Sequence, residues 1–486
     1  MEGELLLPLY LYRFIRLDFV TINLVVILDY TIIILGGIIM KKQNLLVLYS
    51  HNPSRLDHLL KVNLLRKHYR VTLVLDSKDV KDWHKKFVDE ILEVSMTNSL
   101  VDLDIIVSKI KAIGMPDAIL NLSEVCVPLH AALANIFNLV GMPPEIARIA
   151  RNKYFMRRFA KDLGIPIPKF LLWNSDTSME AVSTITFPAI LKPSIGGGSG
   201  IIKRFETFQE FCESKDYYIN LAKMYSKDPL FSETLDKNGK IQFVLEELIG
   251  GETQFDTKFP YPVGEVSVES VFFDGQCKIL AIHDKMLPAN GPFFEEYLWS
   301  TPSRIPKKLK DKAFAYVSKI HQALGAGVYV LHTEFRTFSD ELVLLEFGAR
   351  MGGGPIYTSV KLSTSNDFID ILIALSKGNI PEFSQTTPKP TITHCLWNSS
   401  EGQITQIKGL SAAVFNPFYM GMQIYDDIGD YVYRAPNSTR ACGHIIFRND
   451  VDNNFSVLED SVLDAISKIK IDTQNNSIKP SESNSK

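Results

Sequence analysis

The first part of the chain alternates short apolar runs with segments of helical spacing. NLLVLYS (44–50), VTLVLDS (71–77) and AILNLSE (118–124) are rich in leucine or β-branched residues and have the length of strands. RLDHLLKVNLLRKH, between the first two runs, is amphipathic at helical spacing. This alternation predicts βαβ units around a parallel sheet over residues 41–148, with ligand-binding groups at the carboxyl ends of the strands.

A second pattern begins near residue 149. Two helical segments end at the proline-rich GIPIPKF, and FPAILKP and QFVLEEL are then predicted as strands on either side of a helix. Residues 187–248 should therefore form a small α+β subdomain. EVSVESVFFDG and CKILAIHDK predict a hairpin with its turn at Asp274-Gly275, followed by a helix from Ile305 to Leu324. GVYVLHTEFRTF and ELVLLEFG add two strands to a central domain over residues 149–380.

The end of the chain is again rich in strand-like runs. AAVFNPFYMGMQIYDD and CGHIIFRND predict strands, and one helix is expected from about Val457 to Ile469. We assign residues 381–472 to a C-terminal strand-rich part and expect the polar residues 473–486 to form a disordered tail. The predicted fold class is α/β, with a parallel sheet first and an antiparallel α+β domain after it.

The segment over residues 19–40 is apolar and long enough to span a bilayer, with basic residues on both sides. Asp29 lies at its middle, where a charge is costly in lipid, and the strand at 44–50 begins almost where the span would end. Residues 1–40 are therefore either an apolar extension outside the working fold or a signal anchor. We prefer the extension and expect a cytoplasmic protein, with membrane anchoring through 19–40 as the alternative.

Composition narrows the class of protein without naming an activity. The chain has 486 residues, which is too long for one ordinary core, and 46% are hydrophobic. The net charge of −3, from 52 basic and 55 acidic residues, gives no reason to expect a nucleic-acid partner. The five cysteines form no C-x-x-C pair, which argues against structural zinc and fits a reducing compartment.

Two glutamates are expected to face each other in the hairpin HTEFRTFSDELVLLEFGAR. A turn over Ser339–Glu341, centred on Asp340, puts Glu334 opposite Glu346 with Cβ atoms about 5 Å apart. Like charges in that position repel unless a cation bridges them, and Mg²⁺ combines few protein carboxylates with phosphate oxygens and water. The alternative is an exposed hairpin whose register differs by one residue.

Three further segments carry candidate phosphate- or nucleotide-binding groups. In FPAILKPSIGGGSGI, Lys192 ends an apolar strand and is followed by a glycine-rich loop whose backbone N–H groups could surround phosphate oxygens. The order of lysine and glycines is not that of a P-loop. Lys153 in RNKYFMRRF and the glutamates of VLEELIGGE are further candidates. Taken singly, Lys153 is better explained as a surface lysine and the two glutamates as an exposed strand end. For the glycine run, a flexible loop is the alternative.

The order of these segments carries a family resemblance. Lys153, FPAILKPSIGGGSG, VLEEL, EVSVES, HTEF and LLEFGARMGGG follow one another as in ATP-grasp enzymes, and the resemblance runs from about residue 44 to 470. The sequence most resembles the carboxylate–amine ligase branch, including L-amino-acid ligases and the ATP-grasp part of carnosine synthase. The resemblance implies an N-terminal βαβ domain, a lid subdomain and an antiparallel C-terminal domain.

The resemblance also implies roles for individual residues. Lys153 and Lys192 would hold the α- and β-phosphates of ATP under a lid formed by Gly196, Gly197, Gly198, Ser199 and Gly200. Glu246, Glu247 and Leu248 would line the adenine pocket, and Glu265 or Glu269 would reach the ribose or the metal shell. Glu334 and Glu346 would hold Mg²⁺, for which Mn²⁺ could substitute.

On the substrate side, the resemblance assigns Arg350 to the acyl phosphate and its tetrahedral successor. The backbone N–H groups of Gly352, Gly353 and Gly354 would assist it. Glu296, in PFFEEYLWSTPSRIP, is similar in position to a residue that binds an amino group in related ligases, although a surface glutamate is an equal alternative.

The chain departs from the family pattern at three places. The second metal strand usually has E-x-N-x-R, with the Asn as a further ligand, whereas this chain has Gly348 at that position. The segment IGGETQFDTKFPYPV (249–263) is an insertion that could cover the substrate pocket. STSND (363–367) replaces the more usual S-T-G-x-D helix start.

We therefore expect an ATP-dependent ligase that joins a small-molecule carboxylate, such as an amino acid, to an amine through an acyl phosphate. No nucleic-acid partner is expected, and a homodimer is left open. Two alternatives remain at this stage: a carboxylase-type ATP-grasp enzyme, and a nucleotide-binding regulatory or membrane-tethered protein without turnover.

Overall fold

The computed structural model describes residues 42–474, except 98, 261, 287–292, 326, 328, 435–436 and 438–439. The apolar run at 19–40 lies outside the described residues, so neither interpretation of it is tested. Among the residues that are described, no helix is both long and apolar enough to cross a membrane.

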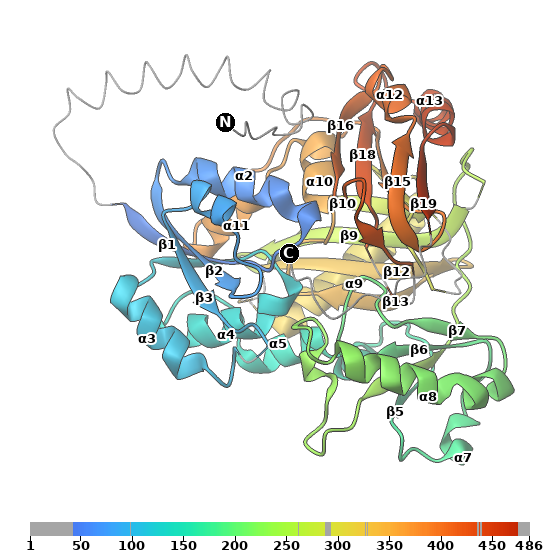
Figure 1. Ribbon diagram of the computed structural model, residues 1–486, viewed down its shortest axis with the longest axis horizontal. Helices are drawn as coiled ribbons and strands as arrows, with labels where there is room; N and C mark the ends of the chain where they lie inside the picture. The colour runs from blue at the N-terminus through green and yellow to red at the C-terminus, as the bar shows by residue number, and fades with distance from the viewer. Residues whose placement is uncertain are drawn as a thin grey trace.

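The N-terminal domain is built on a parallel sheet, as the sequence predicts. Its strand order is β3-β2-β1-β4, and helices cover both faces (Figure 1). The strands are β1 (Gln43–Leu48), β2 (Tyr69–Asp76), β3 (Glu90–Val94) and β4 (Ala118–Asn121), and the helices are α2 (Leu56–Leu65), α3 (Leu103–Ile113) and α4 (Val127–Ile136). Helices α5 (Pro144–Arg151) and α6 (Lys153–Asp162) connect this domain to the rest of the chain.

The predicted lid subdomain has its own antiparallel sheet, with strand order β5-β8-β6-β7. It comprises β5 (Phe170–Trp173), α7 (Met179–Val182), β6 (Ala189–Pro193), β7 (Lys203–Phe205), α8 (Phe208–Tyr225) and β8 (Phe243–Glu247). Because β5 pairs with β8, the sheet begins near residue 170, earlier than the boundary of 187 expected from the sequence.

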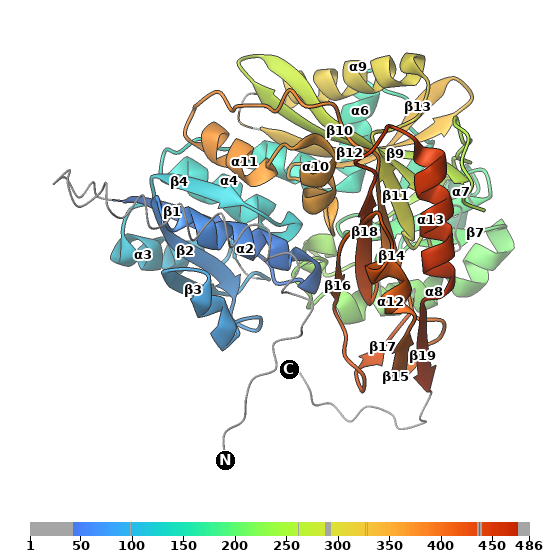
Figure 2. The ribbon, with the colours of Figure 1, turned by 90° about the horizontal axis from the view of Figure 1, so that it is seen from above.

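An eight-stranded antiparallel sheet forms the centre of the molecule. Its order is β13-β12-β9-β10-β11-β14-β18-β16, so strands from the C-terminal part complete the central sheet (Figure 2). The strands are β9 (Pro262–Phe273), β10 (Gln276–Met286), β11 (Leu298–Thr301), β12 (Val330–Phe338), β13 (Glu341–Gly348), β14 (Thr391–Leu396), β16 (Tyr419–Ile424) and β18 (Gly443–Arg448). Residues 381–472 therefore contribute β14, β16 and β18 to the central sheet.

The remaining elements cover this sheet and extend it at the C-terminal end. They are α9 (Lys307–Leu324), α10 (Ile356–Thr364), α11 (Phe368–Ser376), α12 (Leu410–Val414), α13 (Phe455–Ser467) and a small sheet of β15 (Gly402–Lys408), β17 (Tyr431–Val432) and β19 (Lys470–Gln474). Helices α9 and α13 lie within two residues of their predicted bounds. Strand β19 includes the first two residues of the predicted tail, and residues 475–486 lie outside the described part.

Two turns have backbone conformations that explain their sequences. Asp274 and Gly275 both have positive φ, 48° and 70°, as a two-residue turn between β9 and β10 requires, which confirms the predicted hairpin. Ser365, at the glycine position of the usual S-T-G-x-D pattern, adopts a left-handed φ of 60° at the end of α10. Asp367 then caps α11, so the helix start survives the loss of the glycine.

Candidate active site

A cavity of about 230 Å³ lies between the lid sheet and the central sheet. Its walls combine residues of β6, β8 and the glycine loop with residues of β10, β12 and β13. The predicted site residues that border it are Lys153, Lys192, Gly196–Gly200, Glu246, Glu247, Glu265, Glu296, Glu334, Glu346, Arg350, Gly353 and Gly354. Leu248, Glu269 and Gly352 are not among its lining residues.

The two predicted metal ligands face each other as expected, but not through the expected turn. Glu334 pairs directly with Glu346 in the β12–β13 register. The turn contains only Ser339 and Asp340, which alone would misalign the glutamates by one residue. A bulge at Leu345 restores the alignment, and it places both carboxylates on the cleft.

Lys153 is a buried residue of the cleft, so the surface-lysine alternative is wrong. It is the first residue of α6, whose N-cap Asn152 accepts hydrogen bonds from two backbone N–H groups of the helix. Its Nζ lies 3.3 Å from the carbonyl oxygen of Gly196 and 3.2 Å from Glu346 Oε2. A single ammonium therefore connects the glycine loop to the strand that carries the metal ligand.

Glu246 borders the cleft, and its side chain has a role that the resemblance does not imply. It is fully buried, Arg157 donates to its two oxygens at 3.0 and 3.2 Å, and Lys192 forms an ion pair with it. Burial raises the pKa of the Glu246 carboxyl, but Arg157 and Lys192 outweigh burial and hold that pKa below its usual range. The Glu246 side chain therefore fixes Lys192 at the cleft.

The rest of the predicted adenine wall shifts by one residue. The Leu248 N–H donates to the carbonyl of Pro188, and Ile249 borders the cleft in its place. Ile190, Ile202 and Leu345 complete an apolar surface suited to a planar ring. Among the described residues of the insertion 249–263, Ile249 is the one that lines the cleft. The next residues turn away from it, since the Glu252 N–H donates to the carbonyl of Thr337 at the end of β12.

The glycine loop is shaped by packing as well as by flexibility. A Cβ at Gly196 or Gly200 would come within 2.7 or 2.5 Å of the ring of Phe231, so no larger residue fits at either position. The Ser199 hydroxyl donates to the carbonyl of Phe294 at 3.1 Å. The loop thus contacts the opposite wall of the cleft while its backbone remains accessible there.

Lys285 is a site residue that the sequence analysis missed. Its Nζ lies 2.7 Å from Glu296 Oε1 and 3.9 Å from Glu265 Oε1, and it also forms an ion pair with Glu334. Burial lowers the pKa of Lys285, but the three carboxylates outweigh burial and raise it well above its usual value. The register of the β9–β10 hairpin, which pairs Lys285 with Glu265, is the signal that could have found it.

His332 is the second missed residue, and it explains Glu269. His332 Nδ1 bonds to Glu269, and its Nε2 lies 3.2 Å from Glu334 Oε1. Burial lowers the pKa of His332, but Glu269 and Glu334 together raise it to about 9. Glu269 also accepts the N–H of Gly352 at 3.1 Å, so the Gly352 amide is not free to assist Arg350. Of the two alternatives for the ribose or metal shell, Glu265 borders the cleft and Glu269 does not.

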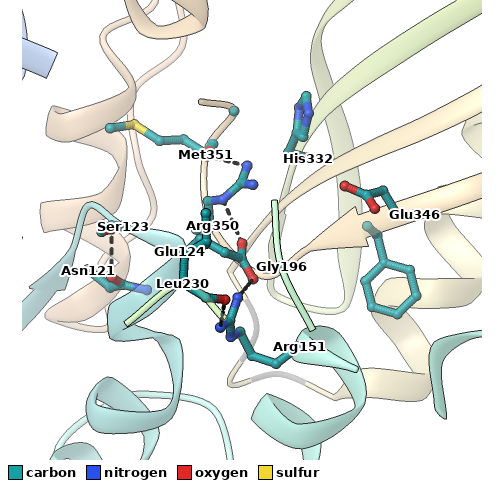
Figure 3. Close-up of polar contacts among 12 residues, drawn as sticks. Asn121, Ser123, Glu124, Arg151, Gly196, Leu230, His332, Glu346, Arg350 and Met351 are labelled. Carbon is teal, nitrogen blue, oxygen red and sulfur yellow. Dashed lines mark hydrogen bonds and ion pairs between the residues drawn. The ribbon is translucent and has the colours of Figure 1, made fainter. Parts of the chain in front are cut away.

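Arg350 lies at the end of the cleft nearest the N-terminal domain (Figure 3). Its Nη1 donates to the carbonyl of Met351 at 2.9 Å, and its Nε forms an ion pair with Glu124 Oε2 at 2.8 Å. Glu124 follows β4 and also accepts from Arg151 at 3.0 Å. The N-terminal domain therefore contributes to the predicted anion-binding end of the site.

The wall that carries Glu296 is held by the C-terminal part. Arg434 Nη2 contacts Glu295 Oε1 at 3.2 Å and the Tyr297 hydroxyl at 2.9 Å, and its Nη1 donates to the carbonyl of Asn398. The Trp397 ring N–H donates to the carbonyl of Glu296 at 2.9 Å. These bonds fix the backbone on both sides of Glu296.

The carboxylates of the cleft fit a hard divalent cation. One oxygen each of Glu265, Glu296 and Glu334 lie within 4.8 Å of one another, and Glu346 lies opposite Glu334. Lys285 and Lys153 neutralise these carboxylates in the structure. Among the described residues, Glu265, Glu296 and Glu334 are the carboxylates close enough to share one cation, and Glu346 faces this group from the neighbouring strand.

Comparison with known proteins agrees with this geometry. Residues 185–359 match the family described as the ATP-grasp domain, the part of the chain that forms most of the cleft. The chain carries an ATP-grasp domain. The predicted ATP-grasp fold, with an N-terminal parallel sheet and antiparallel sheets after it, is confirmed.

The related sequences are distant from this chain. Alanine–anticapsin ligase of Bacillus subtilis is 26% identical over 323 residues, which is 63% of this chain and 64% of the ligase. The L-arginine-specific L-amino acid ligase of the same species is 28% identical over 281 residues, 56% of this chain and 59% of that protein. Protein y4rH of Sinorhizobium fredii is 22% identical over 74% of this chain and 69% of its own length.

Solved structures share the ATP-grasp fold. The L-amino acid ligase from Bacillus licheniformis aligns with 90% of this chain and all of its own, with a TM-score of 0.70 and 19% identity. Phosphoribosylglycinamide synthetase from Anaerococcus prevotii aligns with 89% of this chain and all of its own, with a TM-score of 0.62 and 15% identity.

Proposed function

We propose that this ATP-grasp protein is a carboxylate–amine ligase that forms an amide or peptide bond through an acyl phosphate and releases ADP and phosphate. The observation that carries the proposal is the convergence, in one cleft, of two phosphate-side lysines, a facing carboxylate pair and an arginine. The names of the related L-amino acid ligases support it, and they favour amino acids as substrates.

In the first step, a substrate carboxylate oxygen attacks the γ-phosphorus of ATP, and the bond to the β–γ bridging oxygen breaks, giving ADP and an acyl phosphate. Lys153 and Lys192 would neutralise the negative charge of the phosphates. Glu334 and Glu346 would hold Mg²⁺, which supplies further neutralisation when bound. Positioning and charge neutralisation are the main sources of catalysis in phosphoryl transfer.

In the second step, the neutral amine nitrogen attacks the activated carbonyl, the bond to the phosphate oxygen breaks, and phosphate leaves with the proton that the nitrogen loses. Arg350 and the backbone at Gly353 and Gly354, which border the cleft, would stabilise the oxyanion of the tetrahedral intermediate. The glycine loop closes over the site to exclude water, which would otherwise hydrolyse the acyl phosphate. Glu296, which is close to Lys285, is proposed to accept a substrate ammonium.

The direct test is a phosphate-release screen over pairs of amino acids with the full chain, ATP and Mg²⁺, with products identified by mass. Amide products in at least one pair are the expected result. Phosphate release from a single acid, with a hydroxamate formed on adding hydroxylamine, would identify the acyl phosphate and its donor. Turnover that requires bicarbonate and no amine would contradict the proposal and favour carboxylase-type chemistry.

Glu346→Gln should raise the Mg²⁺ concentration needed for half-maximal turnover by on the order of 100-fold. Even residues that only hydrogen-bond to a metal ligand change metal affinity by about 10–100-fold when they are mutated. Phosphate release measured across a Mg²⁺ titration checks this. Glu341→Gln is the matched control, since Glu341 lies on the same strand but pairs with Lys312 away from the cleft. Equal Mg²⁺ requirements in the two variants would remove Glu346 from the metal site.

Arg434→Met should raise the KM of one amino acid substrate about tenfold, the scale of one lost hydrogen bond to a charged group, and leave the KM of ATP within twofold. The reason is that Arg434 fixes the wall around Glu296 without contacting the phosphate side. Steady-state kinetics with each substrate varied in turn provides the measurement. Lys408→Met, which removes an exposed ion pair with Asp472 in the same part, should change neither KM.

A further inference from the structure

Gly348 occupies the position at which the family pattern has a third metal ligand, and the structure shows what fills the space of the missing side chain. A Cβ built on Gly348 would lie 3.0 Å from Glu124 Oε2 and 3.1 Å from Arg350 Cζ. The φ of Gly348 is outside the left-handed region, so its backbone conformation does not demand glycine. A side chain at residue 348 would therefore press on the Glu124–Arg350 ion pair and push it by a few tenths of an ångström.

Glu124 is shared by two guanidinium groups from different parts of the chain. It lies between Arg350, which follows β13, and Arg151, the last residue of α5 (Figure 3). Arg151 also donates to the carbonyl of Leu230 at 3.3 Å, in the lid subdomain. One buried carboxylate of the N-terminal domain thus connects the arginine of the cleft to the lid.

We propose that Glu124 is the positioning residue for Arg350, and that Gly348 is the residue whose small size allows it to act. The proposal rests on the proposed function, because it assigns Arg350 to an anion beside the metal. An arginine side chain has several rotatable bonds and about 2 kcal/mol of rotamer entropy to lose. Two partners hold the guanidinium before substrate arrives: the charge of Glu124, in ion-pair contact with Nε, and the Met351 carbonyl, which accepts a hydrogen bond from Nη1.

The charge of Glu124 matters as much as its shape. Arg151 and Arg350 both contact this carboxylate, and both side chains are largely buried. Without the negative charge, two neighbouring guanidinium groups would repel each other in surroundings of low dielectric constant. In a Glu124→Gln variant, Arg350 would therefore leave its position, although the glutamine amide has the same size as the carboxylate.

The test adds a methyl group at residue 348 and then removes a methylene group at residue 124. Gly348→Ala should lower kcat by about 3- to 10-fold and leave the KM of ATP within twofold. The loss is smaller than the roughly 100-fold cost of a 1 Å displacement, because the ion pair has to move by only a few tenths of an ångström. Glu124→Asp withdraws the carboxylate by one methylene, so adding it to Gly348→Ala should recover at least part of the loss. Glu124→Gln should lower kcat as much as Gly348→Ala. Glu459→Gln is the matched control, because it breaks a buried Glu–Arg pair, with Arg304, away from the cleft.

A binding measurement separates this proposal from the ligase proposal. Calorimetric titration of inorganic phosphate in the presence of MgADP reports the anion site without any ligation. Wild-type protein should bind phosphate, and Gly348→Ala and Glu124→Gln should weaken that binding about tenfold with MgADP affinity unchanged. If no substrate pair gives an amide but this pattern holds, the ligase function fails and the role of Glu124 stands. Unchanged phosphate affinity in both variants, no phosphate binding by the wild type, or strictly multiplicative effects of the two substitutions would overturn the role.

Discussion

Arg350→Ala is expected to lower the rate of amide formation by on the order of 10²–10³, the cost of removing one oxyanion donor. The physical reason is that the guanidinium borders the cleft next to the strand end that carries Glu346. It can therefore stabilise charge that develops only after the acyl phosphate forms. Single-turnover measurement of amide product with the best substrate pair from the screen gives the rate of this step.

Two companion variants sharpen the test of Arg350. Arg350→Lys keeps the charge but not the planar fork, so it should recover only part of the rate. Arg70→Ala removes an exposed arginine that pairs with Glu90 in the N-terminal domain, and it should leave the rate unchanged. An Arg350→Ala enzyme with near-normal turnover would show that another group stabilises the intermediate.

The facing glutamates illustrate what the sequence could predict about the site. Their pairing followed from the spacing of Glu334 and Glu346 about a turn, and the pairing is confirmed. The turn itself is one residue shorter than expected, and the bulge at Leu345 compensates for it. A bulge depends on packing against neighbouring elements, which a local pattern of residues does not reveal.

Long-range charge pairs account for most of what the sequence did not predict. Glu246 looks like a strand end next to two glycines, yet its partner Arg157 is 89 residues away. Glu124 and Arg350 are separated further still and come from different domains. No periodicity connects such residues, so the sequence could not indicate that Glu246 fixes Lys192 or that Glu269 accepts the Gly352 amide.

Glu246→Gln should destabilise the fold by about 3–5 kcal/mol, the cost of removing one partner from a buried ion pair. The substitution leaves Arg157 and Lys192 buried without their shared carboxylate. Urea unfolding at pH 7 measures the loss, provided that the unfolding of the lid subdomain is followed by a local probe. Asp176→Asn, which breaks an exposed pair with Lys240 in the same subdomain, should cost no more than about 1 kcal/mol.

The pH dependence of this loss gives a second, independent check. The pKa of Glu246 is lower in the folded protein than in the unfolded chain, so its stabilising contribution is present at neutral pH. That contribution must fall as the pH drops below the unfolded value of about 4.3 and through the folded one. The difference in unfolding free energy between wild type and Glu246→Gln should therefore shrink in acid. A difference that stays constant from pH 7 to pH 3 would mean that the carboxylate contributes through its shape and not through its charge.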